Sequence, residues 1–167
     1  MNLLATGQAK DILGVGRYAF AICAAVQGEA IFLRPSEPQA QPEFVRLESL
    51  VAPGILGVLH LGTEEEKTLF VDYASQLDDG EAMSIALAVS RGALLATDDQ
   101  KARRIFVEAT QDATRLLSTS QILKAWVTSN AIGRDQLKTI LSQVTLRARF
   151  SPARSDPEYQ WWSDASR

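Results

Sequence analysis

Short apolar runs alternate along the chain with segments in which apolar residues recur every three or four positions. The first pattern is typical of strands and the second of amphipathic helices. Strands are predicted at residues 18–22, 55–61, 93–97 and 114–118. Helices are predicted at residues 24–34, from 63 to 77, 78–92, 98–109, from 118 onward, and 134–148. The alternation predicts an α/β fold with a mainly parallel sheet.

Local signals set several of the expected helix ends. Thr63 and Glu66 have the spacing of a capping box, and Ser118 with Gln121 repeats that spacing. Gly92 stands where a C′ glycine is expected after the helix over 78–92. In the helix over 134–148 four apolar residues are expected to face inward: Leu137, Ile140, Leu141 and Val144.

The chain length of 167 residues fits one domain, expected over residues 1–150. Residues 34–44 form a Pro- and Gln-rich segment and are predicted to be a loop. Residues 151–167 are predicted to be an irregular tail, in which Trp161 and Trp162 pack onto the domain.

Composition narrows the possible functions. A hydrophobic fraction of 46% and a charged fraction of 22% are ordinary for a globular protein, and no apolar run approaches the length of a membrane span. The single cysteine, Cys23, excludes an internal disulfide, and the single histidine, His60, excludes a His-rich metal site. We therefore expect a reducing, cytoplasmic setting without a membrane partner.

Charge is unevenly spread, with −7 over residues 1–81 and +4 over residues 82–167. A basic surface in the second half is thus allowed, although bulk charge alone does not favour nucleic-acid binding. Three basic residues lie close together directly after a pair of acids: Lys101, Arg103 and Arg104. They are interpreted either as a solvated helix face or as contacts to phosphate.

The pair of acids, Asp98 and Asp99, follows the predicted strand at 93–97. Ligands of parallel sheets bind beyond the carboxyl ends of the strands, where this pair lies. One of the two could cap the next helix, but a cap needs only one carboxylate. Adjacent acids near a third, Glu81, repel one another unless a cation joins them, and oxygen ligands suit Mg²⁺ or Mn²⁺. On these grounds capping and metal binding both remain open. Glu81 could instead be a first-turn acid favoured by the dipole of its own helix, in a capping box with Asp78. Glu29 could be a solvated helix position.

The linked segment LDDGEAMSIALAVSRGALLATDDQKARRIF resembles the PIN-domain family of metal-dependent ribonucleases. It is most similar to the bacterial branch with L-x-x-G-E-A, an alanine-rich helix and L-x-T-D-D-x-x-A-R. Looser similarity extends over most of the chain. The resemblance implies a three-layer α/β/α sandwich with a mainly parallel sheet of four or five strands, followed by C-terminal helices.

The resemblance also implies roles for particular residues. Glu29, Glu81 and Asp99 match the catalytic, metal-binding acids of the family, with Asp98 as an accessory metal ligand or a helix cap. Thr97 supplies the threonine of the family's Thr-x-Asp pattern. With Lys101, Arg103 and Arg104 it is expected to contact the substrate.

One family feature is missing: the first strand and its aspartate would lie before Met1. We therefore expect translation to begin upstream.

The function implied by the resemblance is Mg²⁺- or Mn²⁺-dependent hydrolysis of RNA phosphodiester bonds, as in the toxin of a toxin–antitoxin pair. The implied partners are RNA, a small antitoxin protein and a second copy of the chain. The alternative is a catalytically impaired PIN-fold module that binds RNA or protein, because the first aspartate is absent.

Overall fold

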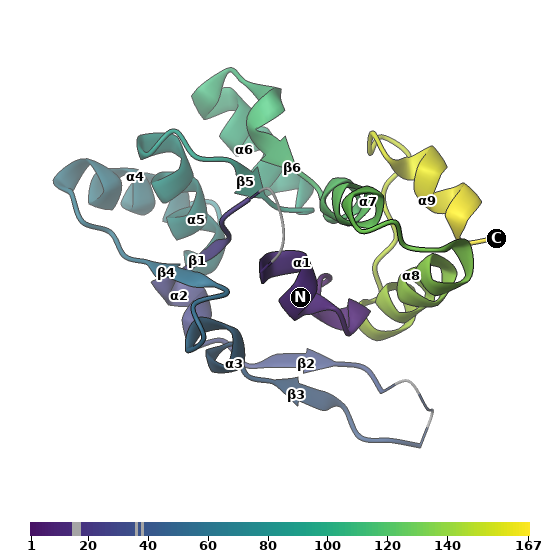
Figure 1. Cartoon of the computed structure of the whole chain (residues 1–167). Coiled ribbons are helices and arrows are strands. Elements are labelled where there is room, and N and C mark those ends of the chain that lie inside the picture. The colour runs from purple at the N-terminus through teal and green to yellow at the C-terminus, as the bar shows by residue number, and fades with distance from the viewer. Residues whose placement is uncertain (15–17, 36, 38) are drawn as a thin grey trace. The chain divides into compact units, whose positions relative to one another are not determined.

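The structure, a computed structural model, describes residues 1–14, 18–35, 37 and 39–167. It is a mixed α/β protein whose chain divides into two compact units (Figure 1). Unit 1 comprises residues 1–19, 30–55 and 119–167, and unit 2 comprises residues 20–29 and 56–118. That residues 1–150 form one domain stays a prediction. Among the described helices, none has the length and apolar character needed to cross a membrane.

Unit 2 contains two parallel strand pairs and the helices that pack on them. Its elements are β1 (Ala21–Cys23), α2 (Ala24–Gln27), β4 (Gly57–Leu59), α4 (Glu64–Ala74), α5 (Asp79–Ser90), β5 (Leu95–Ala96), α6 (Gln100–Thr110), η2 (Ala113–Arg115) and β6 (Leu116–Leu117). Strand β1 pairs with β4, and β5 pairs with β6, both in parallel. Among its described residues, unit 2 thus has two separate two-stranded parallel ladders, whereas one larger sheet was expected.

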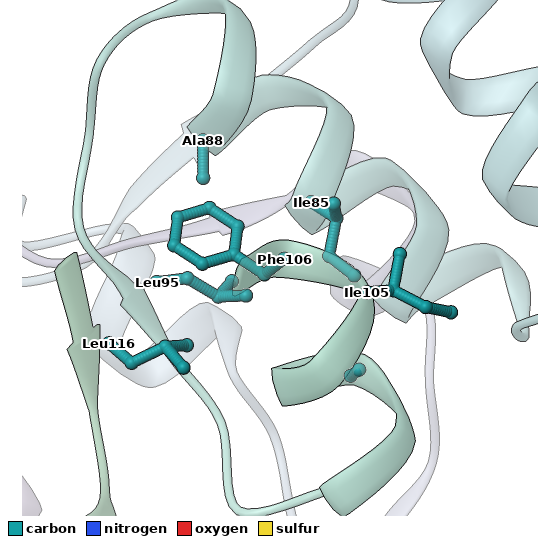
Figure 2. Close-up of a cluster of buried hydrophobic side chains, with 7 residues drawn as sticks. Ile85, Ala88, Leu95, Ile105, Phe106 and Leu116 are labelled. Atoms are coloured by element: carbon teal, nitrogen blue, oxygen red, sulfur yellow. The ribbon is translucent and has the colours of Figure 1, made fainter. Parts of the chain in front are cut away.

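The core of unit 2 lies between α5, α6, β5 and β6. Figure 2 shows Phe106 gathered with Ile85, Leu95 and Leu116, and all four side chains are buried. Full burial of a side chain of this size contributes about 1.5–3 kcal/mol. These contacts pack α5 and α6 against β5 and β6; the predicted acidic residues lie at the starts of the two helices.

Unit 1 contains a β-hairpin and helices from both ends of the chain. Its elements are η1 (Leu4–Thr6), α1 (Ala9–Gly14), β2 (Ile31–Leu33), β3 (Glu43–Val45), α3 (Glu48–Val51), α7 (Thr119–Ser129), α8 (Arg134–Ala148) and α9 (Tyr159–Ala165). Strands β2 and β3 pair antiparallel. Buried Ala5, Leu33 and Ala148 join η1, β2 and α8 into one apolar cluster.

Several expected elements are confirmed. Helix α8 has the predicted bounds, and its four expected core residues are buried. Helix α4 begins with the predicted capping box, in which the Thr63 side chain accepts from the Glu66 N–H and Glu66 accepts in return. Gly92 has a positive φ of 65°, and hydrogen bonds from Gly92 and Ala93 to α5 close its end as expected of a C′ glycine.

Two expectations about the first half are wrong. The helix predicted at 24–34 ends at Gln27, and Ile31–Leu33 is a strand instead. Gly28 follows α2 as its C-cap, and the apolar run after it finds a cross-strand partner in β3. The segment predicted as a loop at 34–44 therefore contains the start of β3, while its residues Ser36 and Pro38 lie outside the described residues.

The C-terminal segment is also more ordered than predicted, because it contains α9. Trp162 is buried and meets Phe150 edge-to-face, with ring centroids 5.5 Å apart. The expected packing of Trp162 onto the protein is confirmed, and its burial accounts for a helix where sequence alone predicted irregular structure.

Candidate functional site

Asp99 is the N-cap of α6. Its Oδ1 accepts hydrogen bonds from the N–H groups of Lys101 and Ala102, both at 2.8 Å. The Asp99 N–H in turn donates to the Thr97 hydroxyl oxygen at 3.2 Å. This arrangement places the carboxylate just beyond the end of β5 and at the N-terminus of α6, where it satisfies N–H groups that have no partner within the helix.

The N-cap of α6 is Asp99, which corrects the alternative in which Asp98 caps this helix. Asp98 is partly buried beside it. Sequence could not separate the two acids, because either position is compatible with a helix start a residue apart. The role of Asp98 as an accessory metal ligand stays a prediction.

Asp78 caps α5 in the same way. Its Oδ1 accepts from the Glu81 N–H at 2.8 Å. Glu81 itself lies in the first turn of α5 and is partly buried. Two successive helices of unit 2, α5 and α6, thus begin with an aspartate cap, and the charges of both caps act on Glu81.

Burial and neighbouring charge raise the pKa of Glu81 above its ordinary value. Desolvation is the largest cause, followed by the negative charges of Asp78 and Asp99, whereas the Lys101 ammonium acts in the opposite direction. The charge of Asp99 therefore acts on Glu81, although Glu81 lies in α5 and Asp99 caps α6. A carboxyl whose charge is disfavoured in this way gains from a nearby cation.

Glu29 also reaches this region, although not from a helix as predicted. It follows α2 and is exposed. A Cβ added at Gly80 would lie 2.9 Å from Glu29 Oε1 and 2.9 Å from Val26 Cγ2, so Glu29 lies directly against the first turn of α5. Gly80 therefore allows the Glu29 side chain to approach the backbone next to Asp78, whose Oδ1 would be 3.6 Å from the same Cβ.

The end of β1 is fixed to this turn by Cys23. Its buried Sγ lies 3.4 Å from the Gly80 carbonyl oxygen, to which it donates, and 3.5 Å from the Ser84 hydroxyl. Contacts between β1, α2 and α5 thus hold the Glu29 segment and the start of α5 together. Cysteine here acts as a small buried packing residue with a weak S–H donor.

The basic residues predicted to contact substrate have different surroundings. The Lys101 ammonium donates to the Gln76 carbonyl oxygen before α5, and it lies near enough to lower the Glu81 pKa. Arg103 donates to the Thr97 carbonyl oxygen at 2.9 Å, which ties α6 back to the end of β5. Arg104 is exposed and lies 3.8 Å from Glu108 one turn along α6, a pairing of little energetic weight.

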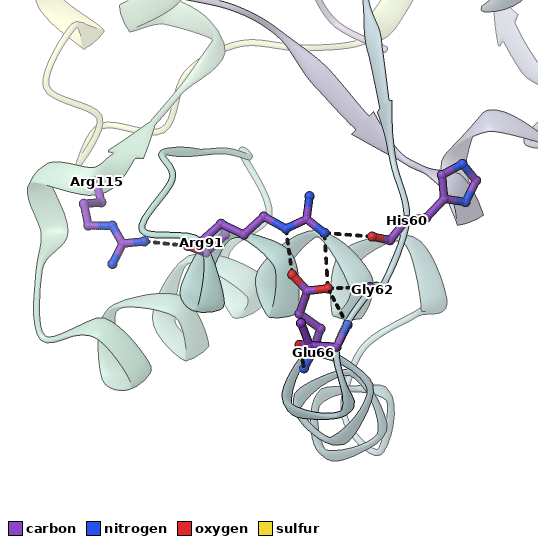
Figure 3. Close-up of polar contacts among 7 residues, drawn as sticks. His60, Gly62, Glu66, Arg91 and Arg115 are labelled. Carbon is purple, nitrogen blue, oxygen red and sulfur yellow. Dashed lines mark hydrogen bonds and ion pairs between the residues drawn. The ribbon is translucent and has the colours of Figure 1, made fainter.

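An ion pair between Glu66 and Arg91, which sequence reasoning missed, also stabilises unit 2. Glu66 is 3% exposed, and its carboxylate accepts from Arg91 Nε at 2.6 Å and Arg91 Nη2 at 3.1 Å (Figure 3). It also accepts from the Gly62 N–H at 2.6 Å, while Arg91 donates to the His60 carbonyl oxygen at 2.8 Å. The pair joins the start of α4 to the end of α5. No sequence signal linked it, since the capping box explained Glu66 alone.

The donors of the candidate site are carboxylate oxygens, which suit hard cations such as Mg²⁺ and Mn²⁺. Over the described part of the chain, three acidic, His or Cys side chains do not converge at one point in the way a complete metal site requires. Glu81 and Asp99 interact electrostatically. Mg²⁺ is commonly bound by one or two carboxylates together with water and substrate phosphate.

Comparisons with protein-family models, curated proteins and solved structures find no match to this chain.

Proposed function

We propose that the chain is a metal-dependent endoribonuclease of PIN type that hydrolyses RNA phosphodiester bonds. The observation that carries the proposal is the electrostatic coupling of Glu81 with Asp99 at the starts of α5 and α6, beyond the end of β5. Acidic side chains in this position of an α/β fold are where a divalent cation and a phosphate ligand would meet.

In this proposal Glu81 and Asp99 hold the cation, and Glu29 and Asp98 complete the acidic surroundings. A bound Mg²⁺ or Mn²⁺ would generate a nucleophilic water and stabilise the negative charge that develops on the phosphate. Asp99 keeps its place through the two N–H groups at the start of α6, which fix the carboxylate in direction. Lys101 offers a positive charge beside Glu81, to which an RNA phosphate would be attracted.

The finer fold belongs to the same proposal. The two parallel ladders of unit 2, with α5 packed against both β1 and β5, are compatible with an α/β/α sandwich of PIN type. A sheet of four or five strands would need the two ladders to pair with each other, directly or through a further strand.

A second candidate follows from the acidic set itself. Because three acidic, His or Cys side chains do not converge at one point among the described residues, the second candidate is a catalytically impaired PIN-fold module that binds RNA or protein. The proposed antitoxin partner and homodimer would then be the basis of its function.

Calorimetric titration with MnCl₂ separates the two candidates. The nuclease should bind Mn²⁺ at millimolar concentration or below, and the charge-removing variant Asp99→Asn should not. Asparagine is as good an N-cap as aspartate, so this variant keeps the start of α6. Asp112→Asn, which changes another capping aspartate outside the site, is the matched control. Absence of Mn²⁺ binding by the unmodified chain would favour the impaired module.

A further inference from the structure

The outward face of the β2–β3 hairpin in unit 1 carries two aromatic rings. Phe32 is 57% exposed and Phe44 is 47% exposed. They are direct partners across the two strands, and their ring centroids lie 5.2 Å apart at an interplanar angle of 40° (Figure 1 shows the two strands side by side). Exposed faces of two-stranded ladders normally carry polar residues, so an aromatic pair here calls for an explanation.

The inward face of the same hairpin already has its packing partners. Leu33 is 1% exposed and lies in the apolar cluster with Ala5 and Ala148, with Val45 packed against it. Glu43 pairs with Arg147 of α8. The register is therefore fixed by this face, and the two phenylalanines are left on the other side because side chains alternate along a strand.

Positive charge flanks the rings. The Arg46 guanidinium lies over the Phe44 ring, 5.5 Å from its centroid. Arg34 follows β2 directly and is exposed. Two residues after Phe32, it would lie on the same side of the hairpin if the alternation of the strand continues past Leu33. The carboxylate of β3, Glu43, is drawn to the opposite side by Arg147.

We propose that this aromatic hairpin face, made of Phe32, Phe44, Arg34 and Arg46, binds single-stranded nucleic acid. Unpaired bases stack on exposed aromatic rings, and the neighbouring guanidinium groups take up the phosphates. Two rings between two cations match that chemistry. A protein partner held by apolar contact would need a patch of several hundred Å², much larger than two rings.

The inference goes beyond the proposed nuclease activity and stands independently of it. Binding at the hairpin needs no divalent cation, so it is measured in EDTA. EDTA removes the cation that the proposed nuclease site of unit 2 requires, so no RNA is cleaved during the measurement. Failure of the hairpin to bind and failure of the nuclease to cleave are thus separate results.

The test is fluorescence anisotropy of labelled 12-nucleotide oligouridine and oligothymidine titrated with the full chain in EDTA. Loss of a stacking ring typically weakens binding by about tenfold. Phe32→Ala and Phe44→Ala should each show a loss of this size, while Phe32→Tyr with Phe44→Tyr, which keeps both rings, should retain binding. Arg46→Ala should weaken binding and lower its salt dependence. The RNA and DNA probes distinguish which strand is preferred, and tight binding of either one supports the proposal.

Leu146→Ala is the control, because it removes a different exposed apolar side chain from unit 1 and should leave binding unchanged. Circular dichroism confirms that each variant is folded. The proposal is overturned if the alanine variants bind both probes within twofold of the unmodified chain. It is also overturned if sedimentation shows that these variants lose only self-association, which would make the rings a contact between protein copies.

Discussion

Glu81, in the first turn of α5, lies within electrostatic reach of Asp99, the cap of α6. Burial is the main cause that raises the Glu81 pKa, and the negative charges of Asp78 and then Asp99 raise it further. The two carboxylates are 18 positions apart in the sequence and belong to different helices. The effect of the Asp99 charge on the Glu81 pKa is the interaction that links the two acids of the candidate site. It can be measured without any assumption about substrate.

Removal of the Asp99 charge should lower the Glu81 pKa toward its ordinary value, because one of the two repelling carboxylates is lost. Lys101→Met should raise the Glu81 pKa further, since the ammonium favours the ionised form. Carboxyl-detected NMR titration of the full chain measures both shifts. Asp112→Asn, at the unrelated cap of η2, should leave Glu81 unchanged. Equal Glu81 titration in all variants would refute the coupling.

The close approach of Glu29 to α5 predicts that Gly80→Ala destabilises the protein. The added methyl would meet Glu29 Oε1 and Val26 Cγ2 at 2.9 Å each, and overpacking of this kind costs about 1–3 kcal/mol. Urea unfolding gives the change in free energy. Gly28→Ala is the control, because its added Cβ meets nothing within 4 Å and its φ of −86° suits alanine. Similar stability of both variants would show that Gly80 is not a point of contact.

The Glu66–Arg91 pair predicts a loss of stability in acid. Hydrogen bonds from Arg91 and Gly62 lower the Glu66 pKa to about 2, whereas the unfolded chain titrates near 4.5. Between these values the unfolded state binds more protons than the folded state. The stabilisation is therefore complete above about pH 4.5 and falls as the pH drops toward 2.

Urea unfolding between pH 7 and pH 3 tests this pair. The free energy of unfolding should fall more steeply with acid for the unmodified chain than for Glu66→Gln. Glu64→Gln is the control, because Glu64 forms only an exposed pair with Lys67 and should keep the acid dependence unchanged. Parallel curves for the unmodified chain and Glu66→Gln would mean that the pair does not contribute.

The buried ring of α9 predicts that the C-terminal segment stabilises unit 1. Trp162→Ala should cost about 3–5 kcal/mol, because it leaves a cavity beside Phe150. Trp161→Ala, at the less buried neighbour, should cost clearly less. Thermal unfolding of the two variants measures the difference, and an equal effect would contradict the packing of Trp162.

Local signals predicted local structure well. The amphipathic period over 134–148 marked both ends of α8, and the Thr63–Glu66 spacing and Gly92 marked helix ends, because caps depend on residues a few positions apart. That Glu81 and Asp99 belong to one metal site stays a prediction.

Contacts between distant residues could not be predicted in this way. Glu66 and Arg91 are 25 positions apart, and no local sequence pattern around either residue indicates that the two form an ion pair. Residues 31–33 form a strand and not the predicted helix, because they pair with β3, which is distant in the sequence. The C-terminal segment forms a helix, because burial of Trp162 stabilises it. Which of two adjacent acids caps α6 depends on a one-residue difference in helix start.

The most direct test of the proposed function is cleavage of a labelled single-stranded RNA by the full chain in MnCl₂, compared with EDTA. We expect Mn²⁺-dependent cleavage by the unmodified chain and by Asp112→Asn, and its abolition in Asp99→Asn, with all three proteins equally folded by circular dichroism. Cleavage that persists in Asp99→Asn, or that is equal in MnCl₂ and EDTA, would show that this carboxylate pair is not the catalytic metal site.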